Sequence, residues 1–205
     1  MDRILLFGGS FNPLHNGHLI VGRAVAERLR VKRVILVPSA SPPHKPGHAL
    51  APADARLALC QAVAAEDPLF HVDDWELKQS GPNYTLLTIQ RFRERHGPDA
   101  ELFWLIGLDS LHELGTWHKA AELVDACTIV SAARPGFDPP APEVLARWFS
   151  PPQIETLLRH VIEGPRIDIA ATDIRARVRA EQCIRYLVPE PVRRAIESRG
   201  MYRGG

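Results

Sequence analysis

Short apolar runs alternate with segments of helical periodicity along most of this chain. Apolar runs bounded by glycine, proline or polar residues indicate strands, and apolar residues at helical spacing indicate helices. The strands are expected at residues 4–7, 34–37, 70–72, 102–106, 128–131 and 167–169. The helices are expected from about residue 52 and at residues 18–29, 84–96, 120–124, 173–179 and 191–199. This β-α-β-α order predicts an α/β fold with a doubly wound, mainly parallel sheet.

Unusual polar segments come directly after several of these apolar runs. They lie at residues 8–18, 39–45, 107–110, 134–136 and 172–175. Parallel strands share a direction, so the loops after them should gather at one edge of the sheet. Ligands of doubly wound sheets bind beyond the carboxyl ends of the strands, near the switch in strand order. We therefore expect these loops to build one site.

Size and charge limit the possible classes of protein. At 205 residues, the chain is expected to form one domain, residues 1–205, with a small C-terminal helical part from about residue 173. The formal net charge of +1 provides no general basic field, so no nucleic-acid partner is expected. The apolar runs are too short to span a bilayer. Prolines cluster at residues 42–46 and 135–152, which predicts long loops there.

The cysteine spacing indicates the redox state of the compartment in which the protein works. Cys60, Cys127 and Cys183 are widely spaced and form no C-x-x-C pair. This pattern favours reduced, buried thiols in the cytoplasm over a disulfide framework or a zinc ribbon.

The segment with the clearest chemistry begins where the first apolar run ends. Gly8 and Gly9 allow backbone N–H groups to approach a phosphate closely, and the helix that follows adds the positive end of its dipole. His15 and His18 add side-chain donors at the same place. These features predict a nucleotide site at which phosphorus chemistry occurs. A plain glycine-rich turn with two incidental histidines is the bland alternative, and a zinc site would need a third ligand that is not adjacent.

Two segments resemble the signatures of the nucleotidyltransferase superfamily. Residues 8–18 match every fixed position of its first signature, G-G-x-F-x-P-x-H-x-G-H. Residues 169–175 resemble the second signature, I-S-S-T-x-I-R, with alanine at both serine positions, 170 and 171. Thr172 is expected to be a helix N-cap whose following amides face an anion. The alternative is that Thr172 only caps its helix while Arg175 lies in solvent.

The middle of the chain resembles one family within that superfamily, the bacterial nicotinate-nucleotide adenylyltransferases. The resemblance rests on residues 41–45, 68–70, 76–78, 82–85, 107–111, 116–118 and 134–136. It implies a Rossmann-like nucleotidyltransferase fold. It also implies transfer of AMP from ATP to nicotinate mononucleotide, which gives deamido-NAD and pyrophosphate, with Mg2+ bound together with ATP.

The resemblance also implies roles for individual residues. The catalytic donors to the α-phosphate and the leaving pyrophosphate would be His15 and His18. The ATP-binding residues would be Gly8, Gly9, Ser10, Phe11, His18, Gly107, Asp109, Ile169, Thr172 and Arg175. The residues binding the mononucleotide would be His44, Lys45, Tyr84, Thr85, Trp117 and Arg134. By residue type alone, Asp109 is equally suited to an ordinary helix N-cap, Trp117 to packing, and residues 44–45 to a solvated basic loop.

The implied nucleophile is consistent with the residues of the candidate site. A phosphate monoester has a second pKa of about 6 and is already anionic near neutral pH, so no strong general base is needed.

Two other functions remain open. One is a superfamily enzyme with a different acceptor, such as nicotinamide mononucleotide or phosphopantetheine. The other is a regulator that binds nucleotide without catalysis, for which the alanines at 170 and 171 are the only support.

Overall fold

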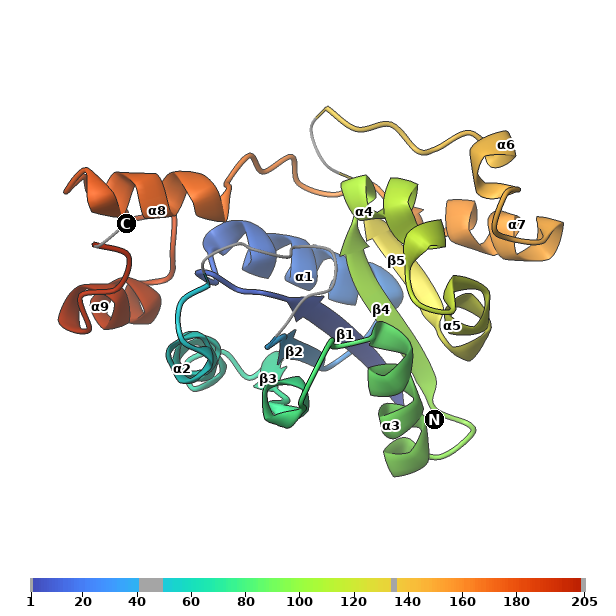
Figure 1. The fold of residues 1–205 in the computed structure, drawn as a ribbon, viewed down its shortest axis with the longest axis horizontal. Coiled ribbons are helices and arrows are strands. Elements are labelled where there is room, and N and C mark those ends of the chain that lie inside the picture. Colours follow the sequence, from blue (N-terminus) through green and yellow to red (C-terminus); the bar gives the residue numbers. More distant parts are fainter. Residues whose placement is uncertain (1, 41–49, 134–135, 204–205) are drawn as a thin grey trace.

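A parallel sheet forms the centre of the molecule (Figure 1). The computed structural model describes residues 2–40, 50–133 and 136–203. The strands are β1 (Arg3–Gly9), β2 (Val34–Pro38), β3 (Phe70–Val72), β4 (Glu101–Gly107), β5 (Thr128–Ala132) and β6 (Val161–Ile162). Their order is β3-β2-β1-β4-β5-β6, and every pair is parallel. The order therefore reverses between β1 and β4, which places the switch point at the middle of the sheet.

Helices cover both faces of the sheet because its buried strands are apolar on both sides. Along β1, Leu5 packs into one core cluster, and Ile4 and Leu6 pack into the other. The Leu5 face is covered by α1 (Asn16–Leu29), α2 (Ala53–Ala64), α8 (Ala171–Arg179) and α9 (Glu190–Ser198). The opposite face is covered by α3 (Thr85–His96), α4 (Leu108–Glu113), α5 (Ala120–Ala126), α6 (Pro142–Leu145) and α7 (Pro151–Arg159). The predicted doubly wound, Rossmann-like α/β fold is confirmed.

Two predictions about the C-terminal half were wrong. Residues 167–169 form no strand, and the last strand is β6, which pairs with Ser131 and Ala132 of β5. The apolar residues of 167–169 line a pocket instead of joining a ladder. Residues 135–152 were predicted to be a loop, but they contain α6 and the start of α7. Pro142 and Pro151 are the first residues of these helices. Proline is favoured at this position because a backbone N–H there would have no partner within the helix, and because its fixed φ is helical.

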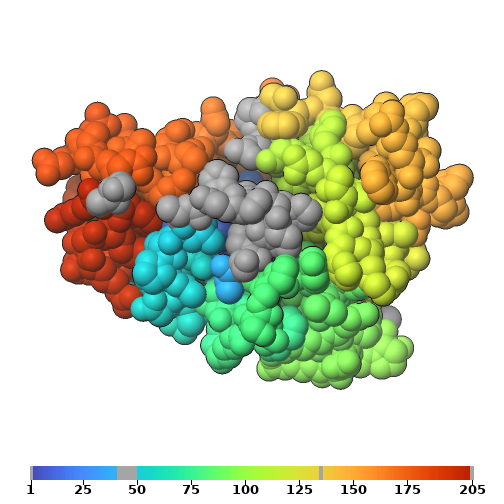
Figure 2. Space-filling view, viewed as in Figure 1, coloured from blue at the N-terminus to red at the C-terminus, as the bar shows by residue number. Residues whose placement is uncertain are grey.

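The C-terminal helices are integrated with the rest of the fold. Figure 2 shows the red α9 region against the cyan α2 region, and the two helices contact each other.

Two short 3-10 helices, η1 (Trp75–Lys78) and η2 (Leu114–Thr116), lie between the main elements. Cys60 and Cys127 are buried as expected, whereas Cys183 is exposed. In the described part of the chain, no helix has the length and apolar character needed to cross a membrane.

Candidate active site

Two adjoining pockets open at the carboxyl ends of β1 and β4, the strands that flank the switch point. The first, named here the histidine pocket, has a volume of about 420 Å³ and is lined by both histidines of the first signature. The second, the tyrosine pocket, has a volume of about 470 Å³ and is lined by Tyr84 and Trp117. Both volumes are in the range of small-molecule sites. The two pockets share as walls the end of β1, the end of β4, Asp109 and Ser110.

The loop after β1 has a backbone that few residues could replace. Gly8 lies directly against the ring of Trp104, so any side chain at position 8 would collide with that indole. Phe11 has a φ of 43°, a left-handed conformation that is uncommon for a non-glycine residue. Strained backbone of this kind persists where the surrounding structure enforces it. The close packing of Gly8 and the turn at Phe11 direct the loop across the pocket to the start of α1.

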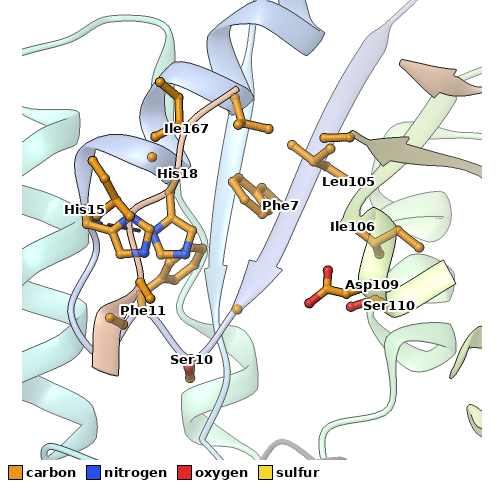
Figure 3. Close-up of a pocket in the computed structure, with 18 of the residues that line it drawn as sticks. Phe7, Ser10, Phe11, His15, His18, Leu105, Ile106, Asp109, Ser110 and Ile167 are labelled. Atoms are coloured by element: carbon orange, nitrogen blue, oxygen red, sulfur yellow. Dashed lines mark hydrogen bonds between the residues drawn. The ribbon is translucent and has the colours of Figure 1, made fainter. Parts of the chain in front are cut away.

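The two signature histidines lie together at the start of α1, with His15 as the N-cap. Their rings stack with centroids 3.6 Å apart, and the ring of Phe11 meets His18 edge-on at 5.2 Å. The backbone N–H of His15 donates to Nδ1 of His18 at 3.2 Å. Because Nδ1 accepts this bond, the neutral imidazole of His18 carries its proton on Nε2. The fold therefore holds His18 as a donor tautomer in the pocket wall (Figure 3).

The second signature segment reaches the first through Arg175. Its guanidinium donates to the backbone carbonyl of Asn12 at 2.7 Å, a contact between residues 163 positions apart. Arg175 also lines the histidine pocket, so the alternative that it lies in solvent is wrong. Thr172 is not the N-cap of α8, as was predicted; that position is held by Ala170, and Thr172 is the second helical residue. The cap position precedes Thr172 because Ala170 already has extended φ/ψ.

Asp109 lies across the histidine pocket from His15 and His18 (Figure 3). It belongs to the first turn of α4, whose N-cap is Gly107, so the alternative of an ordinary N-cap is wrong. Its Oδ1 lies over the α-carbon of Gly107, where the Cβ of any other residue would collide with it. Among the described carboxylate residues, only Asp109 lines both pockets.

The tyrosine pocket is built around the start of α3. Tyr84 is the N-cap of that helix and Thr85 is its first residue, so the amides of Thr85 and Leu86 have no acceptor within the helix. The ring of Tyr84 stacks on His118 with centroids 4.1 Å apart. Trp117 lines this pocket and also packs against the second core cluster. Packing and a place in the site were the two alternatives for Trp117, and its side chain has both.

The structure brings most of the predicted site residues together. Those lining the histidine pocket are Gly8, Gly9, Ser10, Phe11, His15, His18, Gly107, Asp109, Ile169, Thr172 and Arg175. Those lining the tyrosine pocket include Tyr84, Thr85 and Trp117. His44, Lys45 and Arg134 lie outside the described residues.

Arg56 is a site-supporting residue that the sequence analysis missed. Its buried guanidinium donates to the backbone carbonyls of Ser10 and Ser39, each at 2.7 Å, and of Ala51 at 2.9 Å. Burial lowers the pKa of this guanidinium from its ordinary value. An arginine near the start of a helix usually indicates a solvated surface, so no local pattern could have singled it out.

Glu76 was also missed, although it lines the tyrosine pocket. It is only 4% exposed. Burial raises the pKa of its carboxyl group to about 7, a hydrogen bond from Thr88 opposes the shift, and the nearby carboxylate of Asp73 adds to it. The signal available in the sequence was a carboxylate in a segment shared with the resembled family.

No cluster of three or more metal-ligating side chains occurs in the described ranges. A protein-made zinc or calcium cage is therefore not found there. The carboxylate of Asp109 in the pocket lining fits a magnesium ion. Mg2+ usually keeps several waters and binds one or two carboxylates together with substrate phosphates.

Comparison with known proteins gives the family. The cytidylyltransferase-like family model matches residues 6–177. The chain is 37% identical over 204 residues to a protein of Moorella thermoacetica named "Probable nicotinate-nucleotide adenylyltransferase", covering 98% of this chain and 92% of that protein. It is 38% identical to the Geobacillus thermodenitrificans protein of that name, covering 98% and 87%.

A solved structure has the same fold. The Plasmodium falciparum nicotinic acid mononucleotide adenylyltransferase, complexed with NaAD, superposes with a TM-score of 0.78. The superposition covers 100% of this chain and 99% of that chain, at 16% identity, which shows the fold alone. The family model and the two full-length bacterial relatives carry the assignment. The chain therefore belongs to the cytidylyltransferase-like family and, within it, to the bacterial nicotinate-nucleotide adenylyltransferases.

Proposed function

We propose that this protein transfers AMP from ATP to nicotinate mononucleotide, giving deamido-NAD and pyrophosphate. The observation that supports the transfer most directly is the bond from Arg175 to Asn12, which joins both signature segments in one pocket. The named acceptor comes from the curated relatives, which match the chain over nearly its whole length. The adjoining tyrosine pocket provides a second compartment for that acceptor.

The proposed chemistry relies on donors and needs no general base. The attacking phosphate of the mononucleotide is already ionised near neutral pH. Negative charge develops on oxygens of the α-phosphate and on the leaving pyrophosphate. Nε2–H of His18 is a donor in the lining of the histidine pocket, and the ring of His15 stacks on that of His18. Preorganised donors of this kind stabilise developing charge, and Arg175 and Thr172 complete the phosphate side of the site.

The acceptor is proposed to lie in the tyrosine pocket. The amides of Thr85 and Leu86 at the start of α3 are suited to a carboxylate because a helix N-terminus favours anions. The indole of Trp117 is suited to a pyridinium ring, since tryptophan is the best aromatic face for a cation. His44 and Lys45 are proposed to bind the phosphate of the mononucleotide and Arg134 to contribute to the pocket, as the resemblance implies.

Magnesium is proposed to arrive with ATP and to neutralise phosphate charge in the transfer. Asp109 would be its protein partner, directly or through water, because this carboxylate lines both pockets. The cytoplasm is the compartment expected from the reduced thiols.

Pyrophosphate release tests this function. The protein would be given ATP and Mg2+ with nicotinate mononucleotide, nicotinamide mononucleotide or phosphopantetheine in parallel. The expected result is release that depends on nicotinate mononucleotide, with deamido-NAD as the second product. Comparable turnover of the amide mononucleotide would contradict the acid preference. Binding of ATP without release with any of the three acceptors would favour a regulator that has lost catalysis.

A further inference from the structure

The wall of the tyrosine pocket contains a buried polar network centred on Glu76. Its Oε1 accepts a hydrogen bond from the hydroxyl of Thr88 at 2.6 Å, and its backbone carbonyl accepts one from Nδ2 of Asn83 at 2.9 Å. Oδ1 of Asn83 in turn accepts the backbone N–H of Ala40 at 2.8 Å. Glu76, Asn83 and Thr88 are all nearly or fully buried.

These bonds connect three segments that form the acceptor side of the site. Glu76 lies on η1, Thr88 on the first turns of α3, and Ala40 just beyond β2. Asn83 immediately precedes Tyr84, the N-cap of α3. The network therefore fixes the start of α3 against the loop that follows β2. Hydrogen bonds in a buried wall of this kind are electrostatically stronger than in water.

We propose that Glu76 is a positioning residue for the acceptor, which holds the start of α3 in place through Thr88 and Asn83. This inference rests on the proposed function, and it concerns the same pocket. No hydrogen bond reaches the second carboxyl oxygen of Glu76 from the described residues, and the side chain lines the pocket. An ionised Glu76 would therefore repel an acceptor whose carboxylate lies at the start of α3. The neutral form allows the acidic acceptor to bind.

Charged and titratable groups surround Glu76 on three sides. The charged and titratable groups of its own segment are Asp73, Asp74 and Lys78; those of α3 are Arg91 and Arg95; and those across the pocket are Asp109, Glu113 and His118. The β2 residues Val34–Pro38 are uncharged. Arg91 is paired with Asp73 at 3.0 Å, and Lys78 with Asp74 at 2.8 Å. The neighbouring cations thus bind other carboxylates, which leaves burial as the main influence on Glu76.

The first test separates positioning from stability. Thr88→Val removes the hydroxyl at nearly constant shape, and Thr88→Ser retains it. We expect Thr88→Val to raise the KM and the calorimetric Kd for nicotinate mononucleotide by roughly three- to tenfold, the worth of one hydrogen bond. The KM for ATP and kcat should stay near wild type, and Thr88→Ser should restore the affinity. A variant that only lowers Tm, or that raises both KM values equally, would overturn the proposal.

The second test uses pH. In the wild type, the Kd for nicotinate mononucleotide should rise as pH passes from 6 to 8, because Glu76 ionises near pH 7. Glu76→Gln stays neutral and still accepts from Thr88, so its Kd should change only with the ionisation of the ligand phosphate, which is common to both proteins. Glu143→Gln, an exposed substitution on α6, is the matched control. Identical pH profiles for wild type and Glu76→Gln would contradict the proposal.

Failure of the proposed function would be distinguishable from failure of this inference. A wild type that binds the mononucleotide without releasing pyrophosphate contradicts the function, and the binding titrations still decide the role of Glu76. A wild type that does not bind the mononucleotide contradicts both.

Discussion

A backbone hydrogen bond to one ring nitrogen of His18 sets the tautomer of this side chain. Nδ1 accepts the backbone N–H of His15, which leaves the proton on Nε2. We expect His18→Ala to lower kcat by roughly 10²–10³, the usual cost of removing one well-placed donor to developing charge. The lost backbone bond should lower the free energy of unfolding by only about 1 kcal/mol.

Steady-state pyrophosphate release and thermal melting would measure these two effects. The matched control is His71→Ala, because His71 is exposed on β3 and lines neither pocket. Near-normal turnover by the folded His18→Ala variant would remove His18 from the mechanism.

Glu76 should make the stability of the protein depend on pH. Burial raises its pKa to about 7 in the folded protein, against an ordinary value of 4.5. Between these values the folded state binds a proton that the unfolded state has released, so stability falls as pH rises from about 4.5 to 7 and is then constant. The full effect is about 3 kcal/mol, at 1.36 kcal/mol per pKa unit. Glu76→Gln should therefore be stabilised relative to wild type at pH 8.

Urea unfolding at pH 5 and pH 8 would measure this difference. The advantage of Glu76→Gln should be largest at pH 8 and small at pH 5. Equal differences at the two pH values would mean that the carboxyl group titrates normally in the folded protein.

The residues of the site differ in how far the sequence could reveal them. His15, His18 and Arg175 stand in long motifs, so their positions in the site could be predicted. Glu76 and Arg56 could not be, because each acts through burial and through partners distant in the sequence. Burial of a charge is a property of the folded chain and leaves no periodic signal.

The strands and helices were predictable where one local signal dominated. Apolar runs located β1 to β5, because a strand covered on both faces must be apolar throughout. The same signal at residues 167–169 was misleading, since apolar residues also line pockets. α6 and α7 were not predicted because clustered prolines indicate loops, although proline is also favoured in the first turn of a helix.

Arg56 joins elements that would otherwise be independent loops. Its fork binds carbonyls from the loop after β1, the loop after β2 and the segment before α2. Lysine has a compact ammonium group in place of this planar fork. Arg56→Lys should therefore leave at least one buried carbonyl unpaired and lower the free energy of unfolding by about 1–3 kcal/mol. The KM for both substrates should rise, because Ser10 lines both pockets and Ser39 lines the tyrosine pocket.

Melting and steady-state kinetics on one preparation would test Arg56→Lys. Arg28→Lys, an exposed change at the end of α1, is the control and should leave both quantities unchanged. A wild-type melting temperature for Arg56→Lys would show that lysine can hold the same three segments.

On the scale of the whole molecule, the first and last parts of the chain complete one site together. Arg175 of α8 binds Asn12, and the backbone N–H of Asn16 donates to the carbonyl of Leu187 at 2.9 Å. Ile174 and Ile196 belong to the same core cluster as Leu5 of β1. We propose that residues 1–205 form one domain, whose small C-terminal helical part begins at about residue 173.

A shared core predicts that the C-terminal part does not unfold separately. Ile196 on α9 is 2% exposed and packs in the cluster that contains β1. Ile196→Ala should cost roughly 2–4 kcal/mol through the lost transfer energy and the cavity it leaves. Because that cluster joins the C-terminal helices to β1 and α2, calorimetry should show one transition at a lower temperature. The control is Arg194→Ala on the same helix, with its side chain 68% exposed, which should change stability by less than about 0.5 kcal/mol. Two separate transitions in Ile196→Ala, with the larger one at the wild-type temperature, would mean that the C-terminal helices fold as an independent unit that only docks beside the site.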